Sequence, residues 1–163
     1  MVVLAILRGR WGFALILFFA AGVSDAFDGF LARKLGAITS FGAYLDPIAD
    51  KLLMSAIYIA LGVAGAIPWW MVVVVFARDL FILAMAVWGL LFTSIRRFPP
   101  SVWGKVSTFL QIAAALVIMG NRYGIPAPVD LALWLMVAGT IWSGMHYGWR
   151  GLALLRGKHK GGV

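Results

Sequence analysis

The sequence predicts an all-α protein, a polytopic bundle of transmembrane helices, and three observations support this prediction. Hydrophobic residues make up 63% of the 163-residue chain. Charged residues make up 12%, about half of the roughly 25% found in soluble domains. The apolar residues also gather in runs of about 20, the length at which an α-helix crosses the hydrocarbon core of a bilayer. An ordinary water-soluble domain is therefore excluded, and the length allows one membrane domain over residues 1–163.

Five segments are long enough to be full transmembrane spans, and the N-terminal segment is a stub of a sixth. Residues 1–7 are apolar but too short to cross a bilayer alone. Turn-forming residues separate the other segments, with Gly36 before the second, Pro68 before the third and Pro99 before the fourth. The five predicted spans are residues 11–33, 41–66, 69–92, 102–120 and 129–149.

Basic residues are distributed unequally between the two ends of the predicted spans. One side carries Arg33, Lys34, Arg96, Arg97, Arg150, Arg156, Lys158 and Lys160, and the other carries Arg8, Arg10 and Arg122. Because cytoplasmic loops are enriched in Lys and Arg, the first side is predicted to face the cytoplasm. We expect an integral protein of the cell inner membrane or an equivalent membrane, surrounded by its lipids. The basic residues form no continuous face, so no nucleic-acid partner is expected.

The acidic residues are few and clustered. The chain has no glutamate and no cysteine, and four of its six aspartates (Asp25, Asp28, Asp46 and Asp50) lie within residues 25–50. At about 100° per residue, the first two share one face of a helix and the last two share one face of the next. A short connection makes these helices antiparallel neighbours. The four carboxylates are therefore predicted to converge at the cytoplasmic side.

Four converging carboxylates predict a metal centre. They cannot all stay ionised in a low-dielectric site unless cations neutralise them. Oxygen-only ligands select a hard cation, which indicates Mg²⁺, with Mn²⁺ possible. Two divalent ions balance four carboxylates and form the clamp used for displacement at phosphorus.

Residues between these aspartates suit a nucleotide. Gly29, Ala32 and Gly42 keep the facing helix surfaces small and leave room for a base and ribose. Arg33 offers a planar fork to phosphate oxygens just beyond the carboxylates. We therefore expect these four residues to bind a nucleoside diphosphate moiety.

The residues from Asp25 to Asp50 follow the pattern D-x2-D-G-x2-A-R-x8-G-x3-D-x3-D. This pattern resembles, position for position, the signature of the CDP-alcohol phosphatidyltransferase family. The resemblance implies six transmembrane helices, a homodimer, two metals on the four aspartates and a CDP moiety at the small residues and Arg33. It implies transfer of a phosphatidyl group from CDP-diacylglycerol to an alcohol with release of CMP, with Asp50 as the catalytic base. Residues 1–7 lack the Asn, Thr and Arg of the family's first helix, so we expect the native chain to begin upstream.

Weaker signals concern the acceptor alcohol. Residues 101–111 resemble a segment shared by phosphatidylglycerophosphate and cardiolipin synthases, in which Lys105 is a candidate contact for the acceptor phosphate. Arg78 either lines the same pocket or is neutralised by Asp79. The glycerol-phosphate enzymes typically carry a further arginine where this chain has apolar residues 86–88. We therefore predict phosphatidylglycerol as the acceptor, as in a cardiolipin synthase.

Three alternatives remain open. With glycerol 3-phosphate as acceptor, the protein would be a phosphatidylglycerophosphate synthase, and at least two free cations should converge on the dianion. An intramembrane aromatic prenyltransferase also uses paired aspartates and Mg²⁺, but it needs a longer chain. A cation transporter would show internal repeats or broken helices, and neither is evident.

Overall fold

The computed structural model describes residues 1–35, 40–92 and 102–158, and every regular element in these ranges is an α-helix. Side chains are described for most of these residues, but not for 26, 28–30, 32–33, 35, 40–49, 85–92 and 150–158. The helices are α1 (Val2–Leu7), α2 (Trp11–Leu35), α3 (Ser40–Val63), α4 (Trp69–Phe92), α5 (Val102–Tyr123) and α6 (Val129–Lys158). The all-α prediction is confirmed, including the short first element.

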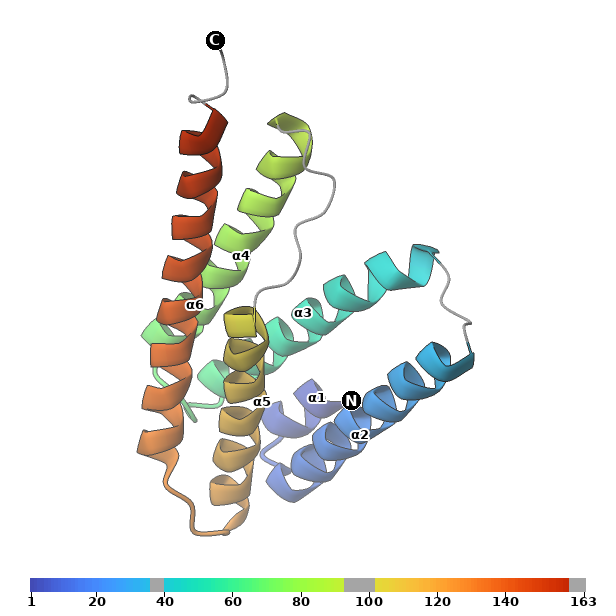
Figure 1. Cartoon of the computed structure of the whole chain (residues 1–163). Helices are drawn as coiled ribbons and strands as arrows, with labels where there is room; N and C mark the ends of the chain where they lie inside the picture. The colour runs from blue at the N-terminus through green and yellow to red at the C-terminus, as the bar shows by residue number, and fades with distance from the viewer. Residues whose placement is uncertain (36–39, 93–101, 159–163) are drawn as a thin grey trace.

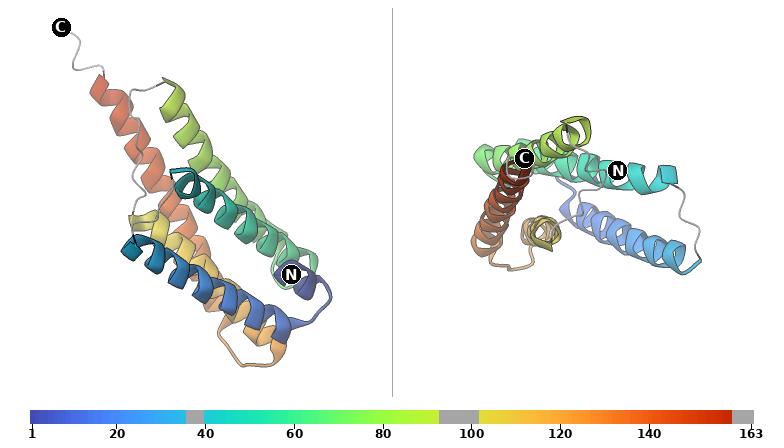
Figure 2. Two further views of the ribbon diagram at one scale, coloured as in Figure 1. Left: turned by 90° about the vertical axis from the view of Figure 1, so that its right-hand side faces the viewer. Right: turned by 45° about the horizontal axis from the view of Figure 1, so that its top comes forward.

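In the left view of Figure 2 the long helices run roughly alongside one another, whereas Figure 1 shows that α2 and α3 are inclined to α4, α5 and α6. α5 lies between α6 and α2, α4 packs against α6, and α3 packs against α4 and α5 (Figure 1). The short helix α1 packs against both α2 and α3. Among the described residues α2 and α3 do not contact each other directly, so the predicted direct packing of these two helices is not observed in that part of the chain.

The end of α3 differs from the prediction, which extended the segment to residue 66. Gly65 has a φ of 64°, a left-handed conformation that favours glycine and stops the helix at Val63. The amide of Ala66 then bonds back to the carbonyl of Leu61 at 2.9 Å. Arg122 of α5 donates to the Gly65 carbonyl at 2.6 Å and so ties this turn to α5. Conversely, α6 continues beyond residue 149, because an apolar span marks only the part of a helix that faces lipid.

The hydrophobic core contains buried side chains from all six helices. Ile6 of α1, Ile57 of α3, Ile118 of α5 and Met136 of α6 are no more than 1% exposed. Burial of such side chains stabilises by about 1.5–3 kcal/mol each relative to exposure. This core fixes the helices whose other ends carry the polar residues discussed below.

Large apolar side chains also cover much of the outer surface. Phe19, Val73, Trp134 and Trp149 are each more than 60% exposed. An apolar surface of this extent marks contact with a membrane or another protein. Within the described residues, α5 alone is long and apolar enough to cross a bilayer, and residues 11–25 form a shorter apolar stretch.

Candidate active site

The aspartate motif occupies two helices, as predicted. Residues 25–33 lie in α2 and residues 42–50 lie in α3. The side chains of Asp25 and Asp50 are exposed to solvent. The structure does not describe the surroundings of the other six motif positions, which are Asp28, Gly29, Ala32, Arg33, Gly42 and Asp46. The convergence of four carboxylates therefore stays a prediction.

The donor set of the motif fits a hard divalent cation. All four candidate ligands are carboxylates, and neither cysteine nor histidine lies within residues 25–50. Hard oxygen ligands of this kind suit Mg²⁺ or Mn²⁺ rather than Zn²⁺. Among the residues whose side chains are described, no group of three or more metal-ligating side chains is present. The metal assignment therefore rests on the chemistry of the motif.

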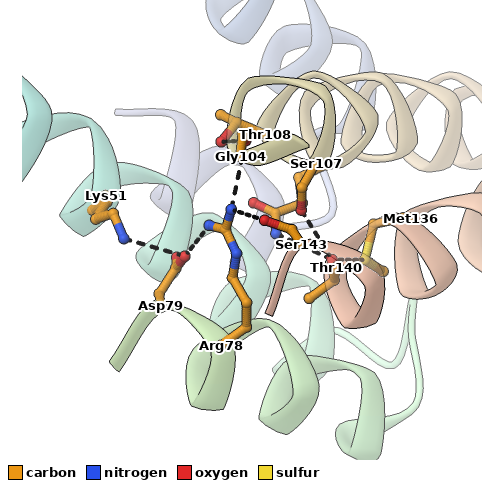
Figure 3. Close-up of polar contacts among 10 residues, drawn as sticks. Lys51, Arg78, Asp79, Gly104, Ser107, Thr108, Met136, Thr140 and Ser143 are labelled. Carbon is orange, nitrogen blue, oxygen red and sulfur yellow. Dashed lines mark hydrogen bonds and ion pairs between the residues drawn. The ribbon is translucent and has the colours of Figure 1, made fainter. Parts of the chain in front are cut away.

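A second polar group lies on α4, in the middle of an apolar helix. Arg78 has a side chain only 7% exposed, and its Nη1 donates to Asp79 Oδ1 at 2.6 Å. Lys51 of α3 donates to the same oxygen at 3.3 Å (Figure 3). We call Lys51, Arg78 and Asp79 the cation cluster. It carries two positive charges and one negative charge.

The guanidinium of Arg78 connects three helices. Its Nη2 donates to Ser143 Oγ of α6 at 3.0 Å and to the Gly104 carbonyl of α5 at 3.5 Å (Figure 3). Its Nε is buried and has no hydrogen-bond partner among the described residues. A buried donor without a partner is costly, because it has lost water and gained nothing. Arg78 therefore keeps one donor group that the described residues do not satisfy.

The cation cluster forms part of the wall of a cavity of about 420 Å³. Lys51, Arg78 and Lys105 supply positive charge to the wall, and Thr108 and Tyr147 supply hydroxyl groups. The rest of the lining is Ile82, Gly104, Phe109 and Ile112. Cavities of this size bind small molecules, of which they typically enclose most of the surface. Arg78 therefore pairs with Asp79 and also lines a cavity, and its contact with the acceptor stays a prediction.

A neutral group of side chains lies beside the cluster, between α5 and α6. Gln111 Nε2 lies 3.3 Å from Thr140 Oγ1, and Ser107 Oγ lies 3.5 Å from the same oxygen. All three residues are at most 2% exposed. Tyr58 of α3 donates to the Gln111 carbonyl at 2.8 Å. We call Ser107, Gln111 and Thr140 the polar seam, and none of the three lines the cavity.

Sequence reasoning missed two residues of this site. Lys51 follows Asp50 directly, and a lysine in an apolar helix is a signal that could have been used. Ser143 gave no signal, because a serine in a predicted span is usually a packing residue. Only the packing of α6 against α4 brings it to Arg78.

The class of protein follows from these observations and from comparison with known proteins. The family model of the CDP-alcohol phosphatidyltransferases matches residues 1–143, and the chain belongs to this family. It is therefore a member of a family of phosphatidyl-transferring enzymes. The matched range includes the aspartate motif, and no described residue gives specific support to the prenyltransferase or transporter alternatives.

Some relatives of this chain have names that are more specific than that of the family. The chain is 38% identical over 141 residues to the Bacillus subtilis "CDP-diacylglycerol--glycerol-3-phosphate 3-phosphatidyltransferase", covering 81% of this chain and 69% of that protein. It is 38% identical over 130 residues to a Mycobacterium tuberculosis "Probable phosphatidylglycerophosphate synthase", covering 77% and 57%. It is 34% identical over 150 residues to a "Putative cardiolipin synthase" of the same organism, covering 91% and 69%. The chain thus spans between 57% and 69% of the length of these relatives.

Proposed function

We propose that the protein transfers a phosphatidyl group from CDP-diacylglycerol to glycerol 3-phosphate and releases CMP. The observation that carries this proposal is the cavity lined by Lys51, Arg78 and Lys105. Two relatives, one named for glycerol 3-phosphate and one named a probable phosphatidylglycerophosphate synthase, are 38% identical, whereas other relatives named for glycerol 3-phosphate are 33–34% identical and the one named a putative cardiolipin synthase is 34% identical. Both the cavity and the relatives favour the alternative acceptor over phosphatidylglycerol, which the sequence alone had favoured.

The charge of the cavity supports a dianionic acceptor. Among the described side chains, the three cations at the wall minus the one carboxylate of Asp79 leave two positive charges. A phosphate monoester carries about −1.5 to −2 at pH 7, whereas the phosphodiester of phosphatidylglycerol carries about −1. A dianion therefore neutralises the cavity, and a monoanion leaves one cation unpaired. The requirement for at least two available cations is met once Lys51 is included.

The position of Lys51 joins this cavity to the aspartate motif. Asp50 and Lys51 are consecutive in α3, about 100° apart around the helix. In the proposed reaction the acceptor phosphate contacts the cations while its glycerol hydroxyl approaches Asp50. Asp50 takes the hydroxyl proton as that oxygen forms a bond to the lipid-side phosphorus, and the bond between this phosphorus and the CMP oxygen breaks. Phosphatidylglycerophosphate and CMP are the products.

The motif would hold the metal ions and the nucleotide. We assign two Mg²⁺ ions to Asp25, Asp28, Asp46 and Asp50, where they would supply charge neutralisation at the phosphates. The residues assigned to the CDP moiety are Gly29, Ala32, Arg33 and Gly42. Each assignment rests on the match to the family signature and on the placement of these positions in α2 and α3.

The protein is further proposed to be a polytopic membrane protein with this site on the cytoplasmic side, and to form a homodimer. Its exposed apolar surface and its family membership support the membrane assignment. The chain has no cysteine, so single cysteines can report topology. In sealed inverted vesicles an impermeant maleimide should label Lys34→Cys and not Asp130→Cys. The opposite labelling would reject the proposed orientation.

The activity is tested with purified protein in detergent, labelled CDP-diacylglycerol and Mg²⁺. Addition of glycerol 3-phosphate should release CMP, EDTA should stop the release, and Mg²⁺ or Mn²⁺ should restore it. Replacing any of the four motif aspartates by Asn should lower turnover by about 10³-fold or more, a scale typical for loss of a preorganised charge. Asp130→Asn serves as the matched control and should retain activity. Rescue by Zn²⁺ alone would contradict the oxygen-only metal site.

A further inference from the structure

Ser143 is a buried residue that touches the cavity wall only through another side chain. It lies on α6, is 0% exposed and does not line the cavity itself. Its hydroxyl accepts a hydrogen bond of 3.0 Å from Arg78 Nη2. A buried hydroxyl bonded to a cation provides more free energy than a neutral pair, because one partner is charged. Ser143 is therefore in a position to control where the guanidinium lies.

Arg78 needs such control. An arginine side chain has about 2 kcal/mol of rotamer entropy, so a guanidinium at the wall of an open cavity does not keep one position by itself. Asp79 holds Nη1, but it is the next residue of the same helix. The contact to the Gly104 carbonyl is long, at 3.5 Å. Among the described residues, Ser143 thus provides the shortest bond that fixes Arg78 relative to another helix.

We propose that Ser143 is a positioning residue that sets the affinity for the acceptor phosphate. This inference rests on the proposed function, because it assumes that Arg78 contacts that phosphate. Ser143 holds the Arg78 fork against α6, so the phosphate meets a guanidinium that is already oriented. Pre-orientation of a binding group lowers the entropy cost of binding. Loss of the hydroxyl should therefore weaken acceptor binding, although Ser143 never touches the acceptor.

The polar seam supplies a matched control. Ser107 is also 0% exposed and also carries a hydroxyl between α5 and α6. It lies 3.5 Å from Thr140 Oγ1, has no hydrogen bond to Arg78 among those described and does not line the cavity. Ser107→Ala and Ser143→Ala therefore remove the same atom from the same layer. A purely structural role predicts that the two variants behave alike.

The test measures KM and kcat for both substrates in the purified full chain. Ser143→Ala should raise the KM for glycerol 3-phosphate about tenfold, equivalent to about 1.4 kcal/mol. Its KM for CDP-diacylglycerol and its kcat should stay within about twofold, the range expected for loss of binding alone. Ser107→Ala should change none of the three values by more than that. If Ser143→Ala does not fold, Ser143→Cys fills the space with a slightly larger side chain whose sulfur is a weak acceptor, and it should give the same increase in KM.

Two results would overturn the inference in different ways. If the wild-type protein uses glycerol 3-phosphate and the two alanine variants have equal KM values for it, Ser143 has no positioning role and the proposed function stands. If the wild-type protein does not use glycerol 3-phosphate, the proposed function and this inference fail together.

Discussion

The cation cluster on α3 and α4 and the polar seam between α5 and α6 are neighbouring polar groups, yet they differ in charge and in access. The seam is neutral, its side chains bond to one another, and it borders no cavity. The cluster carries one net positive charge, its Arg78 Nε has no partner among the described side chains, and Lys51 and Arg78 line a cavity. Arg78 of the cluster and all three residues of the seam are buried, so burial alone does not distinguish a structural group from a binding site.

The difference follows from the free energy of burying polar groups. Neutral groups that bond to each other lose little on leaving water, and they join helices at low cost. A buried charge costs several kcal/mol unless a counter-ion is present. Asp79 is that counter-ion for Arg78, and the remaining positive charge is on Lys51, whose side chain is 40% exposed at the cavity. The cluster is therefore a candidate anion site because its net charge borders a cavity, whereas the seam indicates packing.

The largest expected effect is at Arg78. Arg78→Met removes the most buried cation of the cavity wall and should lower kcat/KM for glycerol 3-phosphate about 100-fold or more, as expected for loss of a charged hydrogen-bonding partner of about 3 kcal/mol. Arg10→Met is the control, since Arg10 is exposed and lies 5.2 Å from the Phe13 ring centroid. Steady-state kinetics measure kcat/KM for both variants. An equal loss in Arg78→Met and Arg10→Met would contradict a specific role of the cation cluster.

Lys51 should have a smaller effect, because its side chain is 40% exposed and is partly screened by solvent. Lys51→Met should raise the KM for glycerol 3-phosphate about tenfold and leave the KM for CDP-diacylglycerol unchanged, consistent with one partly solvated charge pair to a dianion. Kinetics at increasing salt provide a second check. The difference between Lys51→Met and wild type should shrink as ionic strength rises.

Acceptor binding should also depend on pH. The second pKa of a phosphate monoester is about 6, so lowering the pH from 7.5 to 5.5 converts most of the dianion to monoanion and should raise the KM about three- to fourfold. The sign follows from charge, since the cavity wall has two positive charges to match. A phosphodiester does not titrate in this range. A KM that is constant over this interval would argue against recognition of a dianion.

The smallest effect on catalysis is expected in the polar seam. Gln111→Leu removes the 3.3 Å contact to Thr140 but keeps the carbonyl that accepts from Tyr58. Thermal unfolding in detergent should report a loss of about 1 kcal/mol, the typical net value of one hydrogen bond. The KM for glycerol 3-phosphate should stay within about twofold of wild type. A large increase would mean that seam and cluster act as one unit.

Much of the fold could be predicted from the sequence, because a membrane helix is marked by the length of its apolar run. The predicted span 69–92 coincides with α4, since Pro68 fixes its beginning. The segment after residue 41 was extended three residues too far, because the left-handed conformation of Gly65 is not evident from hydrophobicity. The packing of α1 against both α2 and α3 was not predicted either, because it depends on contacts distant in sequence.

The candidate site also has one part that the sequence predicts and another part that only the structure reveals. The motif from Asp25 to Asp50 could be found from spacing alone, because its residues lie within two helices that are consecutive in the sequence. The pocket residues come from α3, α4, α5 and α6, and a sequence does not reveal which residues of separate helices meet. Arg78 and Lys105 were identified individually as candidates. The position of Lys51 at the cavity could be seen only in the structure, and this additional cation changes the expected acceptor.

The central claim is that two net positive charges in the cavity select a dianionic acceptor. The most direct test is a competition in mixed micelles containing glycerol 3-phosphate and phosphatidylglycerol at equal concentration, with labelled CDP-diacylglycerol and Mg²⁺. The labelled products are separated and measured at early times. We predict that phosphatidylglycerophosphate dominates for the wild-type protein and that Arg78→Met reduces this preference. Cardiolipin as the dominant wild-type product would contradict the claim and would restore phosphatidylglycerol as the acceptor.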